Sequence, residues 1–478
     1  MPKRAGLAVF WCCLSLLAKI VPMARYFVFV VIALGLLMVA ISGTAVSVAF
    51  PIITTSFGVS LVLAGWVLTI FQLLATVTMP LAGKVGDIFG VKRIFMLSLL
   101  SFTLGSLFCA LASNIELLIL FRALQGIGAG SFLPVATSIA AREFPGSRQQ
   151  AIGLFTSIFP VGQIIGPNLG GWLVEVFGWR SVFWVNVPLG LVAIIAAVLL
   201  LRGDDREKGQ VDLVGAGLLA ASVFAFLMAL SQLGNNGGSW LGPGVLFASA
   251  GVMTTTFVWY EKRAKAPIID PEVLSERPFL AANIFNLVLG ACVMGVMAFI
   301  PLYTVSVFNM TVFQSGFVLT PRSVAMIAAS TLTSMFLVKW GYRQPMLIGT
   351  LLTVANLILL AAAALGLGTT VGTHINSVVL VSGIMLFAGL GMGITAPAAN
   401  NACIELMPDR VATITGVRGM FRQVGGAVSI AVTSLVLHKV GDMAHGFLFV
   451  FTGLAVVMLV TIPAIFMMPA SPKDIRVA

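Results

Sequence analysis

Charged residues are scarce in this chain of 478 residues: they make up 9% of it, whereas apolar residues make up 59%. A soluble domain carries about 25% charge, so this chain lacks the polar surface that folding in water requires. The composition excludes secreted, nucleic-acid-binding and disordered proteins, even though the net charge is +11. It indicates a polytopic membrane protein, in which basic residues mark the cytoplasmic side.

Residues that bind metals or act as acids and bases are also few. The five cysteines lie in or beside apolar runs and form no CxxC pair. The three histidines, His374, His438 and His445, lie in or at the edges of polar connections. Neither set has metal-ligand spacing, and the apolar runs contain no nucleophile with a partner base. The sequence therefore predicts no metal site, no cofactor and no enzymatic activity.

Apolar runs long enough to cross a bilayer, which takes about 20 residues, recur along the whole chain. Because these runs are long and continuously apolar, they exclude a β-barrel and predict an all-α polytopic membrane protein. We predict fourteen spans, at residues 26–49, 60–82, 94–112, 115–141, 151–174, 181–201, 213–233, 242–260, 279–302, 314–338, 345–366, 377–400, 411–437 and 444–468.

Lysine and arginine are distributed very unevenly between the two sides of these spans. With the N-terminus inside, eighteen basic residues from Arg25 onward lie on the cytoplasmic side, and only Arg180 and Lys439 lie outside. One missed span would invert every later loop, so this bias supports the span count. We predict a multi-pass protein of the cytoplasmic (inner) membrane with both termini cytoplasmic.

Two polar loops divide the chain into parts. They follow the sixth and eighth spans and predict an N-terminal six-helix bundle at 26–201, a linker with two extra spans at 202–278, a C-terminal six-helix bundle at 279–468 and a tail at 469–478. Many transporters have two such halves around a substrate site near the midplane. Residues 1–25 form a separate segment, which is an interfacial helix, an extension upstream of a start at Met23, or, as a minority alternative, a signal peptide.

Glycines in the fifth span form the strongest local signal. Gly162, Gly166 and Gly170 recur every four residues, so they share one helix face and let a neighbouring backbone come close. Pro167 removes a backbone donor and weakens the helix, and Gly171 follows. A helix face without side chains, together with a helix weakened at Pro167, suits two bundles that rock against each other. Close packing within a static bundle is the alternative.

An arginine lies well inside the fourth span. Arg122 is about 9 Å past the outer edge of its helix, where a charge is costly, and Gln125 and Gly126 share its face. We expect Arg122 to point into the bundle or a wet cavity; the alternative is that it extends back to the outer interface.

The loop after the second span combines glycines with charges. Gly83 and Gly90 permit a tight turn, and Asp87 can cap a helix or pair with a basic group such as Lys92 or Arg93. This pattern predicts a conformational latch between the halves, with an ordinary solvated loop as the alternative.

These motifs give the chain a family resemblance that covers nearly all of it after residue 25. It resembles the major facilitator superfamily, and within it the fourteen-span drug:proton antiporters. Residues 83–93 look like the superfamily's signature loop, residues 122–126 like its span-four arginine motif and residues 162–171 like its antiporter motif; residues 179–190 and 422–426 are also similar to this subfamily. The resemblance implies two six-helix bundles plus two extra central spans, and multidrug export.

Departures from the family pattern concern charge. Ile88 and Val91 stand where the signature loop usually has arginines, which implies a weaker latch. Ser42 stands where the first span typically has an aspartate, so the usual proton or cation site is absent. No Asp or Glu lies deep in a span, whereas four arginines do: Arg122, Arg322, Arg418 and Arg422. The interior is net positive, which fits cationic substrates poorly.

The sequence thus predicts a secondary transporter that exports drugs or other amphiphiles by alternating access. A membrane enzyme lacks the residues it would need, and a sensor would bring a soluble output domain. The alternative is a specific exporter of an anionic metabolite, lipid or siderophore that works without a membrane-embedded acid. Expected partners are the lipid bilayer, a small amphiphilic substrate and, if transport is coupled, protons. No nucleic acid is expected, and whether a periplasmic adaptor takes part does not follow from the sequence. The substrate or coupling candidates are Ser42, Arg122, Gln125, Arg322, Arg418, Arg422 and Gln423.

Overall fold

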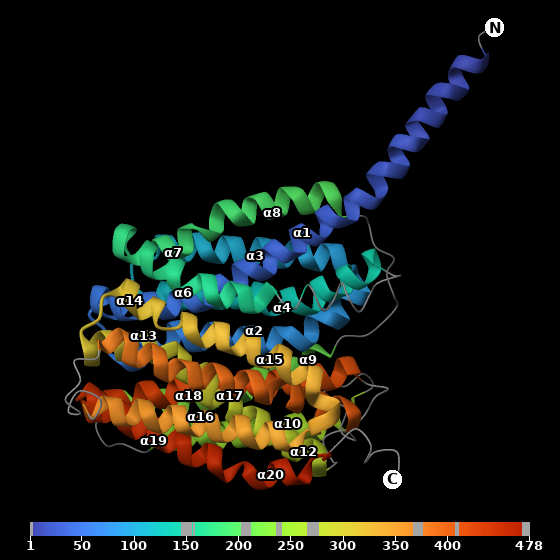
Figure 1. The fold of residues 1–478 in the computed structure, drawn as a ribbon. Coiled ribbons are helices and arrows are strands. Elements are labelled where there is room, and N and C mark those ends of the chain that lie inside the picture. Colours follow the sequence, from blue (N-terminus) through green and yellow to red (C-terminus); the bar gives the residue numbers. More distant parts are fainter. Residues whose placement is uncertain are drawn as a thin grey trace.

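The computed structural model describes residues 3–144, 155, 158–201, 212–235, 241–264, 277–366, 376–406 and 411–470. Within these residues the regular elements are all helices, and they run side by side along one direction (Figure 1). Long apolar runs adopt this form because a helix satisfies its own backbone hydrogen bonds in lipid. The predicted all-α class is confirmed.

One group of helices, which we name the N-terminal half, comprises α1 to α8. Its members are α1 (Lys3–Phe57), α2 (Leu61–Phe89), α3 (Val91–Leu111), α4 (Ile115–Glu143), α6 (Ile158–Phe177), α7 (Ser181–Trp184) and α8 (Asn186–Leu200). Short connections join them. Gly90, with φ of 99°, is the only residue between α2 and α3, and the side chain of Asn114 caps α4 by accepting a hydrogen bond from the backbone N–H of Leu117 at 2.8 Å.

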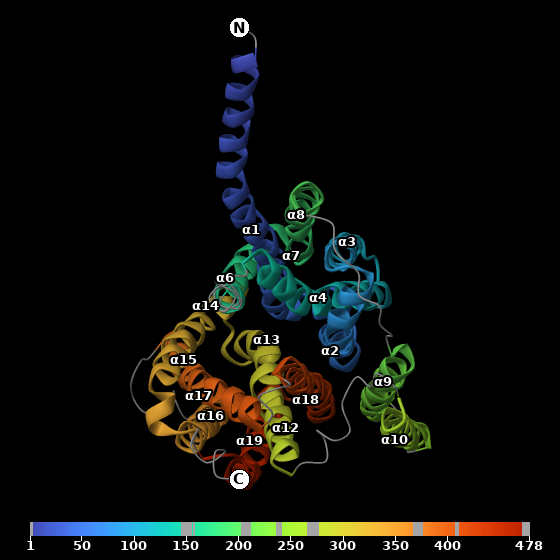
Figure 2. The same cartoon turned by 90° about the vertical axis from the view of Figure 1, so that its right-hand side faces the viewer.

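A second group, the C-terminal half, lies beside the first in Figure 2. It comprises α12 (Arg277–Gly290), the π-helical turn η2 (Ala291–Gly295), α13 (Val296–Phe308), α14 (Val312–Phe317), α15 (Thr320–Trp340), α16 (Arg343–Ala364), α17 (Ser377–Leu406), α18 (Val411–Val440), α19 (Met443–Val460) and α20 (Ile462–Met467). The two extra helices are α9 (Leu213–Asn235) and α10 (Leu241–Glu261).

Among the described residues, eleven helical segments are long and apolar enough to cross a membrane. A shorter apolar helix, Gly217–Leu230, coincides with the seventh predicted span. The remaining two predicted spans coincide with α6, of 20 residues, and α15, of 21 residues. Each of the fourteen predicted runs therefore coincides with a helix.

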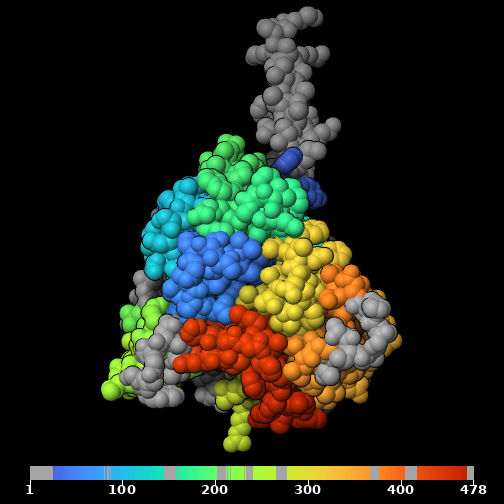
Figure 3. All heavy atoms as spheres, turned by 90° about the vertical axis from the view of Figure 1, so that its left-hand side faces the viewer, coloured from blue at the N-terminus to red at the C-terminus, as the bar shows by residue number. Residues whose placement is uncertain are grey.

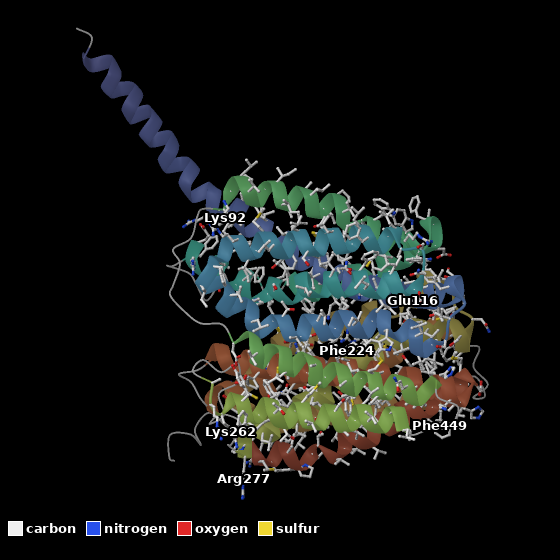
Figure 4. All side chains as sticks on the ribbon, turned by 180° about the vertical axis from the view of Figure 1, so that it is seen from behind. Lys92, Glu116, Phe224, Lys262, Arg277 and Phe449 are labelled. Carbon is white, nitrogen blue, oxygen red and sulfur yellow. The ribbon has the colours of Figure 1, made fainter. Side chains whose placement is uncertain are left out.

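Basic side chains gather at one end of the helix bundle. Figure 4 shows Lys92, Lys262 and Arg277 at this end and Glu116 and Phe449 at the opposite end. We name the two ends the basic end and the opposite end. α1 begins at Lys3, and its first turns project away from the bundle beyond the basic end (Figure 1).

The extra helix α9 covers a line of contact between the halves. The ring of Phe224 on α9 lies 5.7 Å from that of Trp66 on α2. Leu227 of α9 is completely buried in a cluster that also contains Ala427 of α18. α9 therefore packs over the place where α2 and α18 meet, which we name the α2–α18 seam, and α10 packs against α9 farther out (Figure 2).

Candidate functional site

Arg122 lies inside the N-terminal half and is fully engaged there. It is 1% exposed, its Nε donates to the carbonyl oxygen of Val67 at 3.0 Å, and its Nη1 donates to Oε1 of Gln125 at 2.5 Å. The guanidinium carbon lies 4.0 Å from the ring centre of Phe71, a cation–π contact. Arg122 therefore fixes α4 to α2 and does not extend to the interface.

Gln125 connects this arginine to α1 and α3. Its Nε2 donates to Oγ of Ser106 at 2.6 Å and to Oγ of Ser42 at 3.3 Å, and all three side chains are fully buried. Ser42, where the resemblance had led us to expect an acid, thus belongs to a closed hydrogen-bond network ending at Arg122. Because a serine hydroxyl has no charge to gain or lose near neutral pH, this network provides orientation but no proton carrier.

The three-glycine face of α6 packs against α1. A Cβ atom added at Gly170 would lie 2.8 Å from Cα of Ala45, and one at Gly166 would lie 3.0 Å from the carbonyl oxygen of Ile41. We expected this face to lie where two bundles move against each other. That expectation is wrong: α1 and α6 belong to the same half, and the small side chains of α1 let it fill the glycine face.

A different face of α6 meets the C-terminal half. A Cβ added at Gly171 would lie 2.9 Å from Cα of Phe313 on α14, and one at Gly316 of α14 would press on the carbonyl group of Pro167. Asn168 Nδ2 donates to Oγ1 of Thr320 on α15 at 2.7 Å. We name this contact the α6–α14 seam; Gly171 and Pro167, not the regular glycine face, lie between the halves.

The α2–α18 seam is the second contact between the halves. Near its middle, Nε2 of Gln72 donates to Oε1 of Gln423 and lies 3.9 Å from Sδ of Met294. Nearer the opposite end, a Cβ added at Gly65 would lie 3.1 Å from Cβ of Ser434. Gln72 was not among the predicted site residues, although a glutamine in the middle of an apolar span is itself a signal.

Both seams are closed toward the opposite end. Gly65 lies near the start of α2 and Gly171 near the end of α6, and both helix ends are at the opposite end of the bundle. There the rings of Phe50 on α1 and Phe299 on α13 also meet, 5.4 Å apart. Figure 3, which views this end, shows blue atoms of the N-terminal half adjoining yellow and red atoms of the C-terminal half.

Arg418 and Arg422 lie one turn apart on α18. Both side chains are half-buried, and the Nε atom of each is buried without a hydrogen-bond partner among the described residues. The two charges are one helical turn apart and repel one another. Gln423 faces α2 instead, so the predicted set on α18 divides between two surfaces.

Arg322, on α15, is the second buried arginine among the described residues. It is 7% exposed, and its Nε is also unpartnered in the part of the chain that the structure describes. Its backbone packs against α17, because a Cβ added at Gly389 would lie 2.9 Å from the carbonyl carbon of Arg322. The described hydrogen bonds do not join Arg322 to the network around Arg122.

The predicted latch loop is a sharp helix–helix junction. Lys92 Nζ donates to the carbonyl oxygens of Val198, at 3.4 Å, and Leu201, at the end of α8. These two bonds lie within the N-terminal half; a latch between the halves at this loop stays a prediction. The lysine finds the end of α8 because the last carbonyls of a helix lack intrahelical partners. The side chain of Asp87 lies outside the described residues, and so does its predicted pairing with a basic group.

Comparisons with known proteins add independent information. The family model described as Major Facilitator Superfamily matches residues 32–430. The multidrug transporter protein MdtP of Bacillus subtilis is 29% identical over 405 residues, covering 84% of this chain and 73% of the relative. A multidrug resistance protein B homologue of Mycobacterium tuberculosis is 31% identical over 420 residues, covering 85% of this chain and 75% of the relative.

Among solved structures, a bacterial homologue of the human lysosomal transporter Spinster has a TM-score of 0.64. The similarity covers 92% of this chain and 96% of that one, at 16% identity, and shows that the two share a fold.

Proposed function

Because the chain belongs to the major facilitator superfamily, we propose that it is a secondary transporter that exports drugs and other small amphiphiles by alternating access. Relatives named as a multidrug transporter and as a multidrug resistance protein homologue support this substrate class. Transport, rather than catalysis, is what the family membership supports. The observation that carries the mechanism is the pair of seams, both closed toward the opposite end of the bundle.

The two seams allow the halves to rock as units. The α2–α18 seam contains the close approach at Gly65 and the Gln72–Gln423 hydrogen bond. The α6–α14 seam contains the close approach at Gly171. Two helix pairs within the halves, α2 with α4 and α15 with α17, pack together more extensively than either seam does. Opening therefore separates α6 from α14 and α2 from α18, while the network around Arg122 keeps the N-terminal half rigid.

We further propose that the basic end is cytoplasmic and that both termini lie on that side of the cell membrane. The loop charge bias supports this orientation. A cysteine that replaces Ser377, which begins α17 at the opposite end, should react with an impermeant maleimide added to intact cells. Two further positions lie outside the described residues. A cysteine in place of Asn236 should react, and a cysteine in place of Asp205 should not. Labelling at Asp205 in intact cells would contradict this topology.

Coupling can be tested at Ser42. We expect Ser42→Asp to increase export of a lipophilic cation, tetraphenylphosphonium, several-fold and to make it depend on the pH gradient. The new carboxylate would lie beside Gln125, in the place of the family's usual acid, and could accept a proton. Ser42→Asn is the matched control, because asparagine has a similar shape and no charge. Equal cation transport by the two variants would contradict this prediction.

The export proposal itself is tested by counterflow in proteoliposomes with a panel of cationic, neutral and anionic amphiphiles. We expect saturable exchange of at least one class that requires the protein. The alternative of a specific anion exporter is favoured by the unpartnered arginines Arg418 and Arg422.

A further inference from the structure

Two unpaired arginines lie next to a seam that must move. The Nε atoms of Arg418 and Arg422 are buried and unpartnered among the described residues, and the two charges repel one another. A buried charge without a partner is costly, and two adjacent like charges are more so. A negatively charged group bound between them during function would offset this cost.

Arg422 lies at mid-bilayer depth on α18, next in sequence to a residue of the α2–α18 seam. It is about 16 Å from the first residue of α18, near the middle of a bilayer. The next residue, Gln423, contacts Gln72 of the other half, and the backbone of Arg422 packs on Gly290 of α12. The arginine pair therefore flanks the α2–α18 seam.

Within the helices that the structure describes, no acid lies at the same depth as these arginines. Acidic residues in the described helices lie within the first or last turn: Asp87, Glu116, Glu143, Glu175, Glu261 and Glu405. The remaining Asp and Glu residues lie in the connections and the tail. An arginine keeps its proton at any working pH, so the pair acts as a fixed positive charge and not as a proton carrier.

We propose that Arg418 and Arg422 bind the carboxylate or sulfonate group of an amphiphilic substrate, and that its export is electrogenic and driven by the membrane potential. This inference rests on the proposed export function and on the cytoplasmic position of the basic end. An anion that leaves an inside-negative cell moves down the electrical gradient, so no counter-transported proton is required. Transport driven in this way needs no proton-carrying acid, which agrees with the presence of a serine at position 42.

A matched pair of fluorescent probes tests the charge requirement. Anilinonaphthalene sulfonate carries the anionic group, and phenylnaphthylamine has the same rings without it. In proteoliposomes containing the full chain, we expect a potassium diffusion potential, positive on the receiving side, to accelerate sulfonate flux, and a pH gradient at zero potential to leave it unchanged. Sulfonate flux that responds to the pH gradient and not to the potential would overturn the inference.

Variants locate the site. We expect Arg422→Gln to lower sulfonate flux about tenfold or more, as loss of a charge-assisted hydrogen bond would, and to leave phenylnaphthylamine flux within about twofold. Arg422→Lys should retain most of the sulfonate flux. Arg180→Gln, which removes an exposed arginine at the opposite end, should affect neither probe. Equal losses for both probes in Arg422→Gln would make Arg422 a structural residue.

The same flux measurements distinguish a lipid anion from a transported anion, and failure of this inference from failure of the export proposal. Full sulfonate flux in phosphatidylcholine that is abolished by adding phosphatidylglycerol would assign the arginines to a lipid headgroup and overturn the substrate assignment. Transport of the neutral probe without any preference for the sulfonate would overturn the inference while export stands. Transport of neither probe by the wild-type protein would contradict export by this chain, and the inference with it.

Discussion

Replacement of Gly166 by leucine is expected to abolish transport while the chain still inserts into the membrane. A Cβ at this position would lie 3.0 Å from the carbonyl oxygen and 3.1 Å from Cα of Ile41, and it would also press on Oγ1 of Thr44. The backbone of α1 would have to shift, which costs about 1–3 kcal/mol for overpacking. The shift would move Ser42 away from Gln125. Export by membrane vesicles, normalised to protein detected by immunoblot, measures the effect.

A lipid-facing glycine provides the matched control. Gly453 on α19 is exposed, and a Cβ added there would meet no atom within 4 Å. Gly453→Leu should therefore export at the wild-type rate. A well-expressed Gly166→Leu variant that transports normally would show that α1 and α6 do not need to approach this closely.

The second large effect is expected at the α6–α14 seam. Gly171→Leu would place a side chain against the backbone of Phe313 in the other half, where the added Cβ alone would lie 2.9 Å from Cα. Because the clash exists only while this seam is closed, the variant should rest with the opposite end open. We expect loss of transport, and a smaller loss in Gly171→Ala.

A reporter cysteine distinguishes this conformational shift from misfolding. Ser315 on α14 is fully buried, so Ser315→Cys should react slowly with an impermeant maleimide in an otherwise wild-type chain. Adding Gly171→Leu should raise the labelling rate about tenfold, corresponding to roughly 1.4 kcal/mol in the opening equilibrium. Adding Gly166→Leu should not raise it, since that residue lies within one half. Unchanged labelling in the Gly171→Leu background would contradict the placement of this seam.

The helices could be predicted because a long apolar run that crosses a bilayer must satisfy its own backbone hydrogen bonds, and an α-helix does so. Each predicted span coincides with a helix, and the depth of Arg122 along α4 correctly indicated a side chain inside the bundle. Spacing of three and four residues also identified Gln125 as a neighbour of Arg122.

Spacing along one helix does not reveal which helix lies opposite, and this explains what was missed. The period of Gly162, Gly166 and Gly170 correctly defines a face, but only the packing shows that α1 occupies it. Lys92 donates to backbone carbonyls at the end of α8, and backbone carbonyls carry no sequence signal that would identify them as partners. Gln72 and Gln423 are separated by hundreds of residues, so a single sequence cannot pair them.

Alternation of the halves is tested most directly by a disulfide across the α2–α18 seam. Cβ atoms at positions 65 and 434 would lie 3.1 Å apart, slightly inside the usual disulfide range of about 3.5–4.5 Å. The test uses the double variant Gly65→Cys and Ser434→Cys, with the five native cysteines replaced by alanine or serine. We expect oxidation to cross-link the chain and stop transport of every substrate, and a reductant to restore transport. Undiminished transport by fully cross-linked protein would contradict it.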